Sequence, residues 1–478
     1  MPRHWQVLIV VTAGAFLANL DLFIVNVAFP AIRADFPDVG LSGLSWVLNG
    51  YAIVFAALLV PAGRFADRLG RKRMFLGGMG VFLCASVLCA AAPDVVELVA
   101  ARVLQATGAA IMIPTSLALL LPEFAPNRRR AAVGLWTAGA AMAATLGPVV
   151  GGLLVAISWR WVFLVNLPIG CVTLGAGMII LRESRDSTTA PRPDVLGTLI
   201  LCLGVGALAL GIVKGGSWGW ASVQFFATET AAAMAVLVVV MRSARHPAPV
   251  IELGLLRVRA TRAANISVFL FSMGFFPLLL ASILFLTEVW HYSVVQAGAA
   301  IAPGPLMVAL FSWPAGIIAG RRGPRVVVVP GVLLFAVACG WWAATAGASP
   351  DYLAEMLLPM IMVGIGVALT FPVLAGAAVA DLPASRAATG SAIFNMARQI
   401  GGVTGVAVLV AMLGSSASIL VGLRAGWIFM AGAAVGAGAG LLVFGGRSVA
   451  DPPVTGSPMP HPASHRPQDL QLESEPIR

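Results

Sequence analysis

Three of the charged side chains inside long apolar segments of the chain are candidates for chemistry. Asp21 lies about fifteen residues into the first apolar run, and Arg102 and Arg398 lie within two later ones. A charge in the core of a bilayer is costly unless it is paired, hydrated or neutralised, so such residues usually mark a transport pathway. Desolvation favours the neutral form of an acid, so we expect Asp21 to gain and lose a proton. A carboxylate that only ties neighbouring helices together is the alternative.

Polar side chains accompany both arginines. Gln105 follows Arg102 on the same face of a helix, and Asn395 and Gln399 lie beside Arg398. An arginine at this depth needs a carbonyl, carboxylate or water partner, so Arg102 is expected to hold the acid of the first run in register. The alternative for both is a structural contact, and Arg398 could also reach the membrane interface. The candidate residues of a substrate cavity are Asn26, Asn49, Tyr51, Gln105, Phe394, Asn395 and Arg398.

A glycine- and proline-containing segment lies in the fifth apolar run. Gly147 and Gly151 are four residues apart, with Pro148 and Gly152 beside them. Proline bends a helix, and small residues at this spacing let two helices approach closely. The segment is therefore predicted to form a bent, tightly packed contact between helices. Its residues are candidates for conformational gating.

A second candidate gate is the basic segment 63–73, GRFADRLGRKR, which we expect to be a loop. A glycine there would let a helix end approach a neighbour, and Asp67 could meet a helix N-terminus or an arginine across the loop. Positive charge that only follows the membrane topology is the simpler alternative. The gating candidates in this segment are Gly63, Asp67, Arg68, Gly70 and Arg71.

The sequence contains no pattern typical of an enzyme or a cofactor site. Gly204 and Gly206 lie in an apolar run with no preceding strand, and there is no Walker loop, so ATP is not expected to drive the protein directly. The histidines do not pair at metal-ligand spacing within an apolar run, so no metal is expected. Cys84, Cys89, Cys171, Cys202 and Cys339 all fall in apolar runs and are predicted to be small buried residues without disulfides.

Composition places these residues in an integral membrane protein. The chain has 478 residues, 59% hydrophobic and 10% charged, whereas a soluble protein carries roughly 25% charged residues. The apolar runs are long and continuous, which predicts helices that satisfy their own backbone in lipid. We predict an all-α fold with fourteen transmembrane helices, at 6–30, 44–62, 74–92, 96–121, 131–156, 161–181, 194–213, 222–241, 263–287, 295–319, 326–346, 353–376, 388–413 and 417–445.

The distribution of basic residues tests this helix count. With a cytoplasmic N-terminus, the outward-facing loops and the adjoining helix ends hold Arg33, Arg160, Lys214 and Arg424, and nearly all other basic residues face inward. The positive-inside rule predicts such a bias, so both termini are expected to be cytoplasmic. The net charge of +10 therefore indicates topology in a cell membrane, and no basic segment carries the interleaved aromatic residues that would favour nucleic-acid binding.

A weak internal repeat suggests two related halves. The segments 63–73 and 320–325 are both glycine- and arginine-rich and follow the second helix of a six-helix set, if the seventh and eighth helices are an insertion. The predicted domains are a six-helix bundle at 1–182, two inserted helices with connectors at 183–262, a second bundle at 263–446 and a disordered cytoplasmic tail at 447–478.

Several motifs together resemble the major facilitator superfamily, and within it the fourteen-helix branch of drug:proton antiporters. They are LDLFIVNVAFP at 20–30, the segment 63–73, RVLQATGAA at 102–110, GPVVGG at 147–152 and WRWVFLVNLPIG at 159–170. The resemblance covers the chain to about residue 445. It departs from the branch at Ala106, where glycine is usual, and at Thr287, where glutamine is usual.

The resemblance implies a proton-driven exporter of drugs, antibiotics or related amphiphilic molecules. Its two bundles would rock around a central cavity, with Asp21 and Arg102 in proton coupling and the glycine segments as gates. A proton-coupled importer of a metabolite is the first alternative, which the direction of flux separates from export. A membrane sensor or scaffold that transports nothing is the second, and the tail is its only support.

Overall fold

The computed structural model describes residues 1–125, 128–185, 193–382 and 386–444. In this part of the chain every regular element is a helix, and the described helices form one compact unit. The predicted tail at 447–478 lies outside the described residues.

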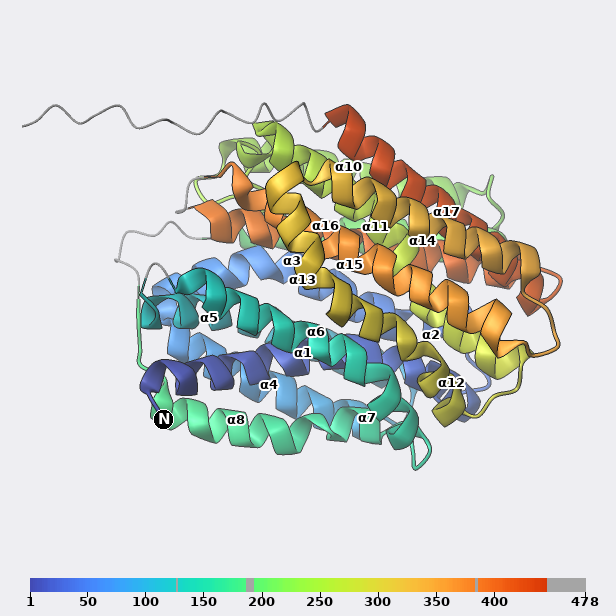
Figure 1. Ribbon diagram of the computed structural model, residues 1–478, viewed down its shortest axis with the longest axis horizontal. Helices are drawn as coiled ribbons and strands as arrows, with labels where there is room; N and C mark the ends of the chain where they lie inside the picture. Colours follow the sequence, from blue (N-terminus) through green and yellow to red (C-terminus); the bar gives the residue numbers. More distant parts are fainter. Residues whose placement is uncertain (126–127, 186–192, 383–385, 445–478) are drawn as a thin grey trace, which may run out of the picture. The chain divides into compact units, whose positions relative to one another are not determined.

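The helices occur in three groups along the chain (Figure 1). The first group is α1 (Arg3–Asp35), the short α2 (Leu41–Leu44), α3 (Trp46–Leu69), α4 (Arg71–Ala91), α5 (Val95–Leu120) with η1 (Leu121–Glu123), α6 (Arg129–Val155), the short α7 (Trp161–Leu164) and α8 (Asn166–Ile180). The inserted pair is α9 (Val195–Trp218) and α10 (Val223–Arg245). The last group is η2 (Leu255–Arg257), α11 (Arg259–Leu284) with η3 (Phe285–Val289), α12 (Val294–Ile301), α13 (Pro303–Arg322), α14 (Arg325–Thr345), η4 (Tyr352–Leu357) with α15 (Leu358–Ala380), α16 (Ala387–Ser415) and α17 (Ile419–Phe444).

The predicted all-α fold with fourteen membrane helices is confirmed. Among the described residues, 13 helical segments are long and apolar enough to cross a membrane. The fourteenth is α6, which has 27 residues, some with side chains outside the described set. The helices extend a few residues beyond the predicted apolar runs because polar and charged residues at their ends reach past the lipid core.

The inserted pair packs on the seam between the two six-helix groups. Helix α9 contacts α3 of the first group and α16 of the last, whereas the main packing partner of α10 is α9. The outer helix α10 presents Val223, Phe226, Met234 and Leu237 on its surface. A helix that is apolar on its exposed face is suited to lipid contact.

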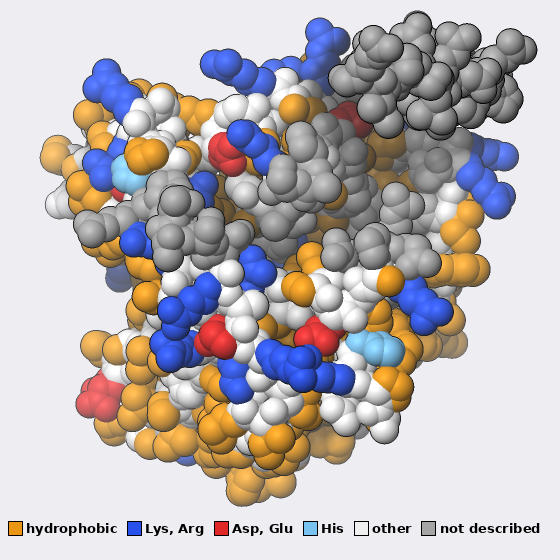
Figure 2. Space-filling view, turned by 90° about the vertical axis from the view of Figure 1, so that its left-hand side faces the viewer, with side chains coloured by type: hydrophobic (Ala, Val, Ile, Leu, Met, Phe, Trp, Pro, Cys, Tyr) orange, Lys and Arg blue, Asp and Glu red, His pale blue; other side chains and the backbone are white. Residues whose placement is uncertain are grey.

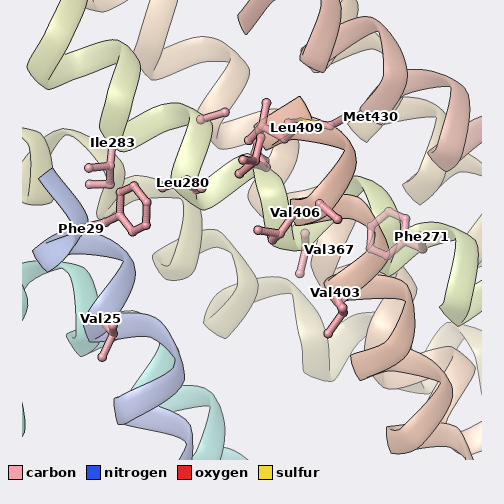
Figure 3. Packing of buried hydrophobic residues seen from close by; sticks show 14 of the residues in the cluster. Val25, Phe29, Phe271, Leu280, Ile283, Val367, Val403, Val406, Leu409 and Met430 are labelled. Carbon is pink, nitrogen blue, oxygen red and sulfur yellow. The ribbon is translucent and has the colours of Figure 1, made fainter. Parts of the chain in front are cut away.

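Apolar packing also joins the two groups directly. Phe29 of α1 belongs to the same buried cluster as Leu280 and Ile283 of α11, and Figure 3 shows these side chains together. Lipid tails are as apolar as leucine, so close van der Waals packing stabilises such contacts in a membrane more than burial from water does.

The expected loop at 63–73 is wrong, because α3 continues to Leu69 and α4 starts at Arg71. Gly70 alone forms the break, with φ of 113°. The corresponding break in the last group is Gly323, between α13 and α14, with φ of 85°. Residues with a side chain rarely adopt a positive φ, so both turns use glycine. The shared geometry supports the predicted internal repeat.

Two cysteine predictions are also wrong. Cys84 and Cys171 are exposed, whereas Cys89 and Cys339 are buried. Both exposed thiols lie on helices of the first group, α4 and α8. An apolar run does not by itself distinguish the lipid-facing side of a helix from the protein interior, which explains the error.

One close helix contact that a substitution can test is that of α4 with α5. A Cβ atom at Gly108 would lie 2.6 Å from the carbonyl oxygen of Gly78 and 2.6 Å from the backbone nitrogen of Phe82. We expect Gly108→Ala to destabilise the protein by about 1–3 kcal/mol, since neither backbone can move aside easily. The matched control is Gly80→Ala, where nothing lies within 4 Å. Equal thermal unfolding midpoints for the two purified variants would contradict the prediction.

The inserted pair is held together at one end by Asp194. Its buried carboxylate accepts hydrogen bonds from Nε of Arg242 at 2.7 and 2.9 Å and from the N–H of Gly197 at 2.8 Å. Burial raises the pKa of Asp194, but these donors together outweigh it, so its pKa lies below the usual value.

This shift predicts a pH dependence of stability. A carboxyl group with a lowered pKa stabilises the fold above its unfolded pKa of about 4, and the contribution is lost as pH falls through the folded pKa. We expect Asp194→Asn to lower the thermal midpoint at pH 7, with the deficit shrinking below about pH 4. Asp38, which is exposed, provides the control substitution Asp38→Asn. A deficit that does not change with pH would argue against the ion pair as its cause.

Candidate functional site

A buried ion pair joins α1 and α5 in the middle of the first group. Nη1 of Arg102 donates a short hydrogen bond to Oδ2 of Asp21, and the two side chains are 1% and 0% exposed. The structure thus brings together the two residues predicted for proton coupling. Removing the charge of either residue would leave the other charge uncompensated inside the protein.

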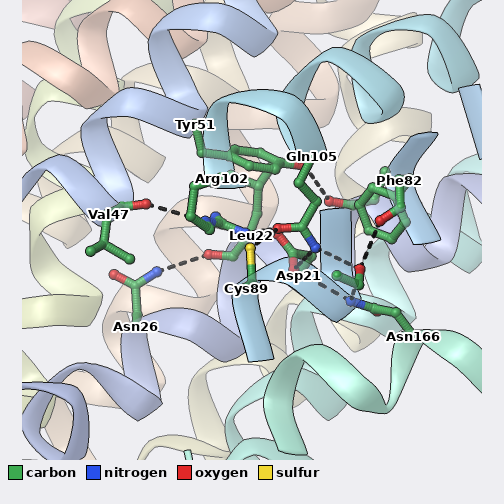
Figure 4. A network of polar contacts seen from close by, with 12 residues as sticks. Asp21, Leu22, Asn26, Val47, Tyr51, Phe82, Cys89, Arg102, Gln105 and Asn166 are labelled. Atoms are coloured by element: carbon green, nitrogen blue, oxygen red, sulfur yellow. Dashed lines mark hydrogen bonds and ion pairs between the residues drawn. The ribbon is translucent and has the colours of Figure 1, made fainter. Parts of the chain in front are cut away.

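Three further polar side chains surround the carboxylate (Figure 4). The amide nitrogen of Gln105 donates to Oδ1 of Asp21 at 2.9 Å and to Oγ of Ser86 at 2.9 Å. Asn166 of α8 donates to the same two acceptors at 3.5 and 3.3 Å. Four helices, α1, α4, α5 and α8, therefore hold Asp21 in place.

The arginine is fixed from the opposite side. Its Nε donates to the carbonyl oxygen of Val47 at 3.2 Å, and Nη1 also donates to Oε1 of Gln105 at 2.6 Å. The guanidinium lies 4.1 Å from the centre of the Tyr51 ring, a cation–π contact. Arg102 thus keeps partners from α3 and α5 besides the acid, so a change in the charge of Asp21 would alter only part of its environment.

A cavity lies beside the ion pair, between the two six-helix groups. It has a volume of about 30 Å³, room for about two water molecules. Residues of α1, α3, α5, α11 and α16 line it, namely Leu22, Asn26, Leu48, Asn49, Ala52, Arg102, Phe276, Gln399, Gly402, Val403 and Val406. A drug-sized molecule could enter this space only after the helices move apart.

The predicted cavity residues fall into three sets. Asn26 and Asn49 line the cavity, and Tyr51 and Gln105 instead belong to the buried network around Asp21. In the last group, the other predicted residues do not line this cavity: Phe394 is buried in the apolar cluster, Asn395 donates to the carbonyl of Ser391 in its own helix, and Arg398 lies partly buried on α16.

Sequence reasoning missed Ser86, Asn166, Phe276 and Gln399 as members of the site. Asn166 belongs to the motif at 159–170, and Gln399 adjoins Arg398, so a polar residue in an apolar run was an available signal for both. Ser86 carried a weaker signal, because serines in membrane helices often bond only their own backbone.

The gating candidates of segment 63–73 lie on the face where α1 begins. We call this the Arg-rich face, and it includes Arg68, Arg71 and Arg73. Figure 2 shows arginine and lysine side chains gathered there. Asp67 accepts two hydrogen bonds from Arg71, at 3.0 and 2.9 Å, which confirms the expected contact with an arginine.

The N-terminus of α4 is occupied by a different acid. The carboxylate of Glu183 accepts hydrogen bonds from the N–H groups of Lys72 and Arg73 at 3.1 and 3.2 Å. A Cβ at Gly63 would meet Pro114 at 3.4 Å, an ordinary contact distance. The close approach expected at Gly63 is therefore not required, whereas Gly70 is needed for its positive φ.

The segment at 147–152 packs tightly on both sides, as expected. A Cβ at Gly147 or Gly151 would lie 2.9 Å from side-chain atoms of Phe23 or Ile24 in α1. On its other side, a Cβ at Gly152 would lie 3.0 Å from the carbonyl oxygen of Val294 in α12. This contact joins the two six-helix groups on the face opposite the Arg-rich face.

An ion pair supplements that contact between the groups. Nη1 of Arg33, near the end of α1, lies 3.7 Å from Oε1 of Glu288 in η3. Both side chains are more than a third exposed, so the pair is a weak contact on its own. It marks the same end of the molecule as the Gly152 contact.

Comparisons with known proteins agree with this architecture. The family model of the Major Facilitator Superfamily matches residues 11–406. The tetracenomycin C resistance and export protein of Streptomyces glaucescens is 30% identical over 86% of this chain and 76% of its own length. The methylenomycin A resistance protein of Bacillus subtilis is 32% identical over 92% and 93%.

A solved structure supports the fold independently. The crystal structure of a D-xylose–proton symporter superimposes with a TM-score of 0.69 over 93% of this chain and 98% of the other, at 15% sequence identity. The sequence match, the two six-helix groups and the apolar helices lead to one assignment. The chain belongs to the Major Facilitator Superfamily and is a multi-pass membrane transporter related to antibiotic-resistance and export proteins.

Proposed function

We propose that this transporter exports an amphiphilic small molecule in exchange for protons, and that Asp21 carries the proton. The observation that supports this most strongly is the buried pair of Asp21 and Arg102. Asp21 is 0% exposed to solvent, yet its partner Arg102 lines the cavity between the groups. A change in the charge of Asp21 can therefore reach the cavity through one side chain.

The exchange follows if the two ligands favour different orientations of the groups. Protonation of Asp21 removes its attraction for Arg102 and leaves a cation without its anion. Cargo and proton then exclude each other if the cargo binds the arrangement in which the ion pair is intact. The names of the two antibiotic-resistance relatives favour export over uptake.

Alternating access would require the contacts between the groups to break and reform. We assign sealing of the face opposite the Arg-rich face to Gly147, Pro148, Gly151 and Gly152, where α6 meets α1 and α12. On the Arg-rich face, Asp67, Arg68, Gly70 and Arg71 would form the second gate. Gly63 would have a smaller role there, because its neighbour lies at ordinary contact distance.

The proposed setting is the cell membrane, with the Arg-rich face and both termini in the cytoplasm. The loop charges favour this orientation. The two bundles would then comprise residues 1–182 and 263–446, with the inserted helices within 183–262. Cargo, protons and lipid would be the partners, and no ATP is required.

Everted membrane vesicles test the proposal. The vesicle lumen is acidified, and the proton gradient is followed with acridine orange. Adding tetracenomycin C, methylenomycin A or fluorescein should dissipate the gradient only when the transporter is present. Vesicles collapsed with a protonophore are the control. Binding of one of these compounds without any dissipation of the gradient would contradict proton exchange. Movement of the compound out of the vesicle lumen, and not into it, would indicate an importer.

A further inference from the structure

The helices that line the cavity carry few acids. Apart from Asp21, the acids of α1, α3 and α5 are Asp35, Asp67 and Glu97, all in the first or last turn. Helices α11 and α16 contain no aspartate or glutamate. The carboxylate of Asp21 is already held by Arg102, Gln105 and Asn166. An organic cation entering here would therefore meet no carboxylate that is free to pair with it.

A second cation lies next to the opposite wall, although it does not line the cavity itself. Arg398 is on α16, one residue before Gln399 of the cavity lining. Its Nε is buried and has no hydrogen-bond partner in the described part of the chain. The ring of Phe371 lies 6.0 Å from its guanidinium, at the limit of a cation–π contact. Arg102 is neutralised by Asp21, so the region carries one net positive charge.

The cavity wall also contains a buried amide without partners. Gln399 is 1% exposed, and both its amide nitrogen and its amide oxygen lack a hydrogen bond among the described residues. The amide nitrogen of Asn49, across the cavity, is likewise unpartnered. Buried polar groups are normally satisfied, so an unpartnered amide facing a cavity indicates a ligand or water. Leu22, Phe276 and Val403 supply an apolar surface around these amides.

We propose that the cargo is an acidic amphiphile, with a carboxylate or phenolate that pairs with Arg398 and accepts a hydrogen bond from Gln399. Its rings would pack against Phe276 and the aliphatic side chains. This inference rests on the proposed export function and narrows it, because lipophilic cations are excluded as preferred cargo. An anion compensates the buried charge of Arg398, whereas a cation adds to it.

Binding of two dyes with the same xanthene ring and opposite charge tests the proposal. Fluorescein is anionic and rhodamine 123 cationic near neutral pH. With the purified protein in phosphatidylcholine nanodiscs, fluorescence anisotropy should show fluorescein binding about tenfold or more tightly than rhodamine 123, the size expected for one charge-assisted hydrogen bond. No pH gradient is present, so a failure here is separate from a failure of proton exchange in vesicles.

Substitutions test whether Arg398 and Gln399 cause the preference for the anionic dye. Arg398→Gln should weaken fluorescein binding about tenfold or more, and Arg398→Lys should retain most of it. Gln399→Glu should shift the preference toward rhodamine 123. Arg321→Gln, on the exposed end of α13, removes one positive charge elsewhere and should change neither affinity. Tighter binding of rhodamine 123, no binding of fluorescein, or fluorescein affinity unchanged in a folded Arg398→Gln protein would each overturn the proposal.

Discussion

Replacing Asp21 with asparagine should abolish proton-coupled export while the transporter still inserts in the membrane. Asparagine has nearly the same shape and can still accept hydrogen bonds from Gln105 and Asn166, but it cannot bind and release a proton. Everted vesicles should therefore show no cargo-dependent loss of the proton gradient, at the level of vesicles without the protein. Export at the wild-type rate would remove Asp21 from proton coupling.

A second readout separates coupling from cargo binding. Exchange of labelled for unlabelled cargo across the membrane needs no net proton movement, so Asp21→Asn should retain it at saturating cargo, with a weaker apparent affinity because the ion pair is missing. Asp21→Glu keeps a titratable group in the same network and should retain part of the coupled export. If Asp21→Asn loses both exchange and export, Asp21 is required for binding or folding and not specifically for the proton.

Arg102→Ala should have the largest effect on stability, a loss of about 3–5 kcal/mol. The substitution leaves the carboxylate of Asp21 buried without its cation, and it also removes the contacts with Val47 and Tyr51. We expect a lower thermal unfolding midpoint and little protein in the membrane. A midpoint close to that of the wild type would show that Asp21 does not depend on Arg102 as its counter-ion.

A double-mutant cycle isolates the ion pair from those other contacts. In Asp21→Asn/Arg102→Ala no uncompensated charge remains, so the double variant should be more stable than Arg102→Ala alone. Arg102→Lys, which keeps the charge but lacks the planar fork, should lie between wild type and Arg102→Ala. Additive losses in the double variant would mean that the two side chains stabilise the fold independently.

The fold could be predicted from the sequence because membrane helices are nearly self-contained. Each helix must satisfy its own backbone hydrogen bonds, so the length of an apolar run identifies it as a membrane helix. The asymmetry of basic residues between the two sides then tests the number of helices. The break at Gly70 could not be placed, because helices continue past the lipid core into water. A charged segment such as 63–73 is equally compatible with a loop and with two helix ends.

The candidate site was predicted in part for a similar reason. Asp21 and Arg102 were identifiable because each is costly in lipid alone, so a partner was required. Ser86 and Gln399 are neutral, and whether such a residue faces a partner, a cavity or its own backbone depends on helix rotation. The exposure of Cys84 and the burial of Cys89 show how much that rotation decides within one helix.

The position of α9 has a consequence for how cargo could arrive. Because α9 contacts both α3 and α16, it fills the seam between the two groups along that side of the protein. A molecule dissolved in the lipid leaflet would therefore have to displace α9 to reach the cavity from this side. With α9 and α10 in this position, cargo would reach the cavity from the aqueous faces or through the opposite seam between the two groups.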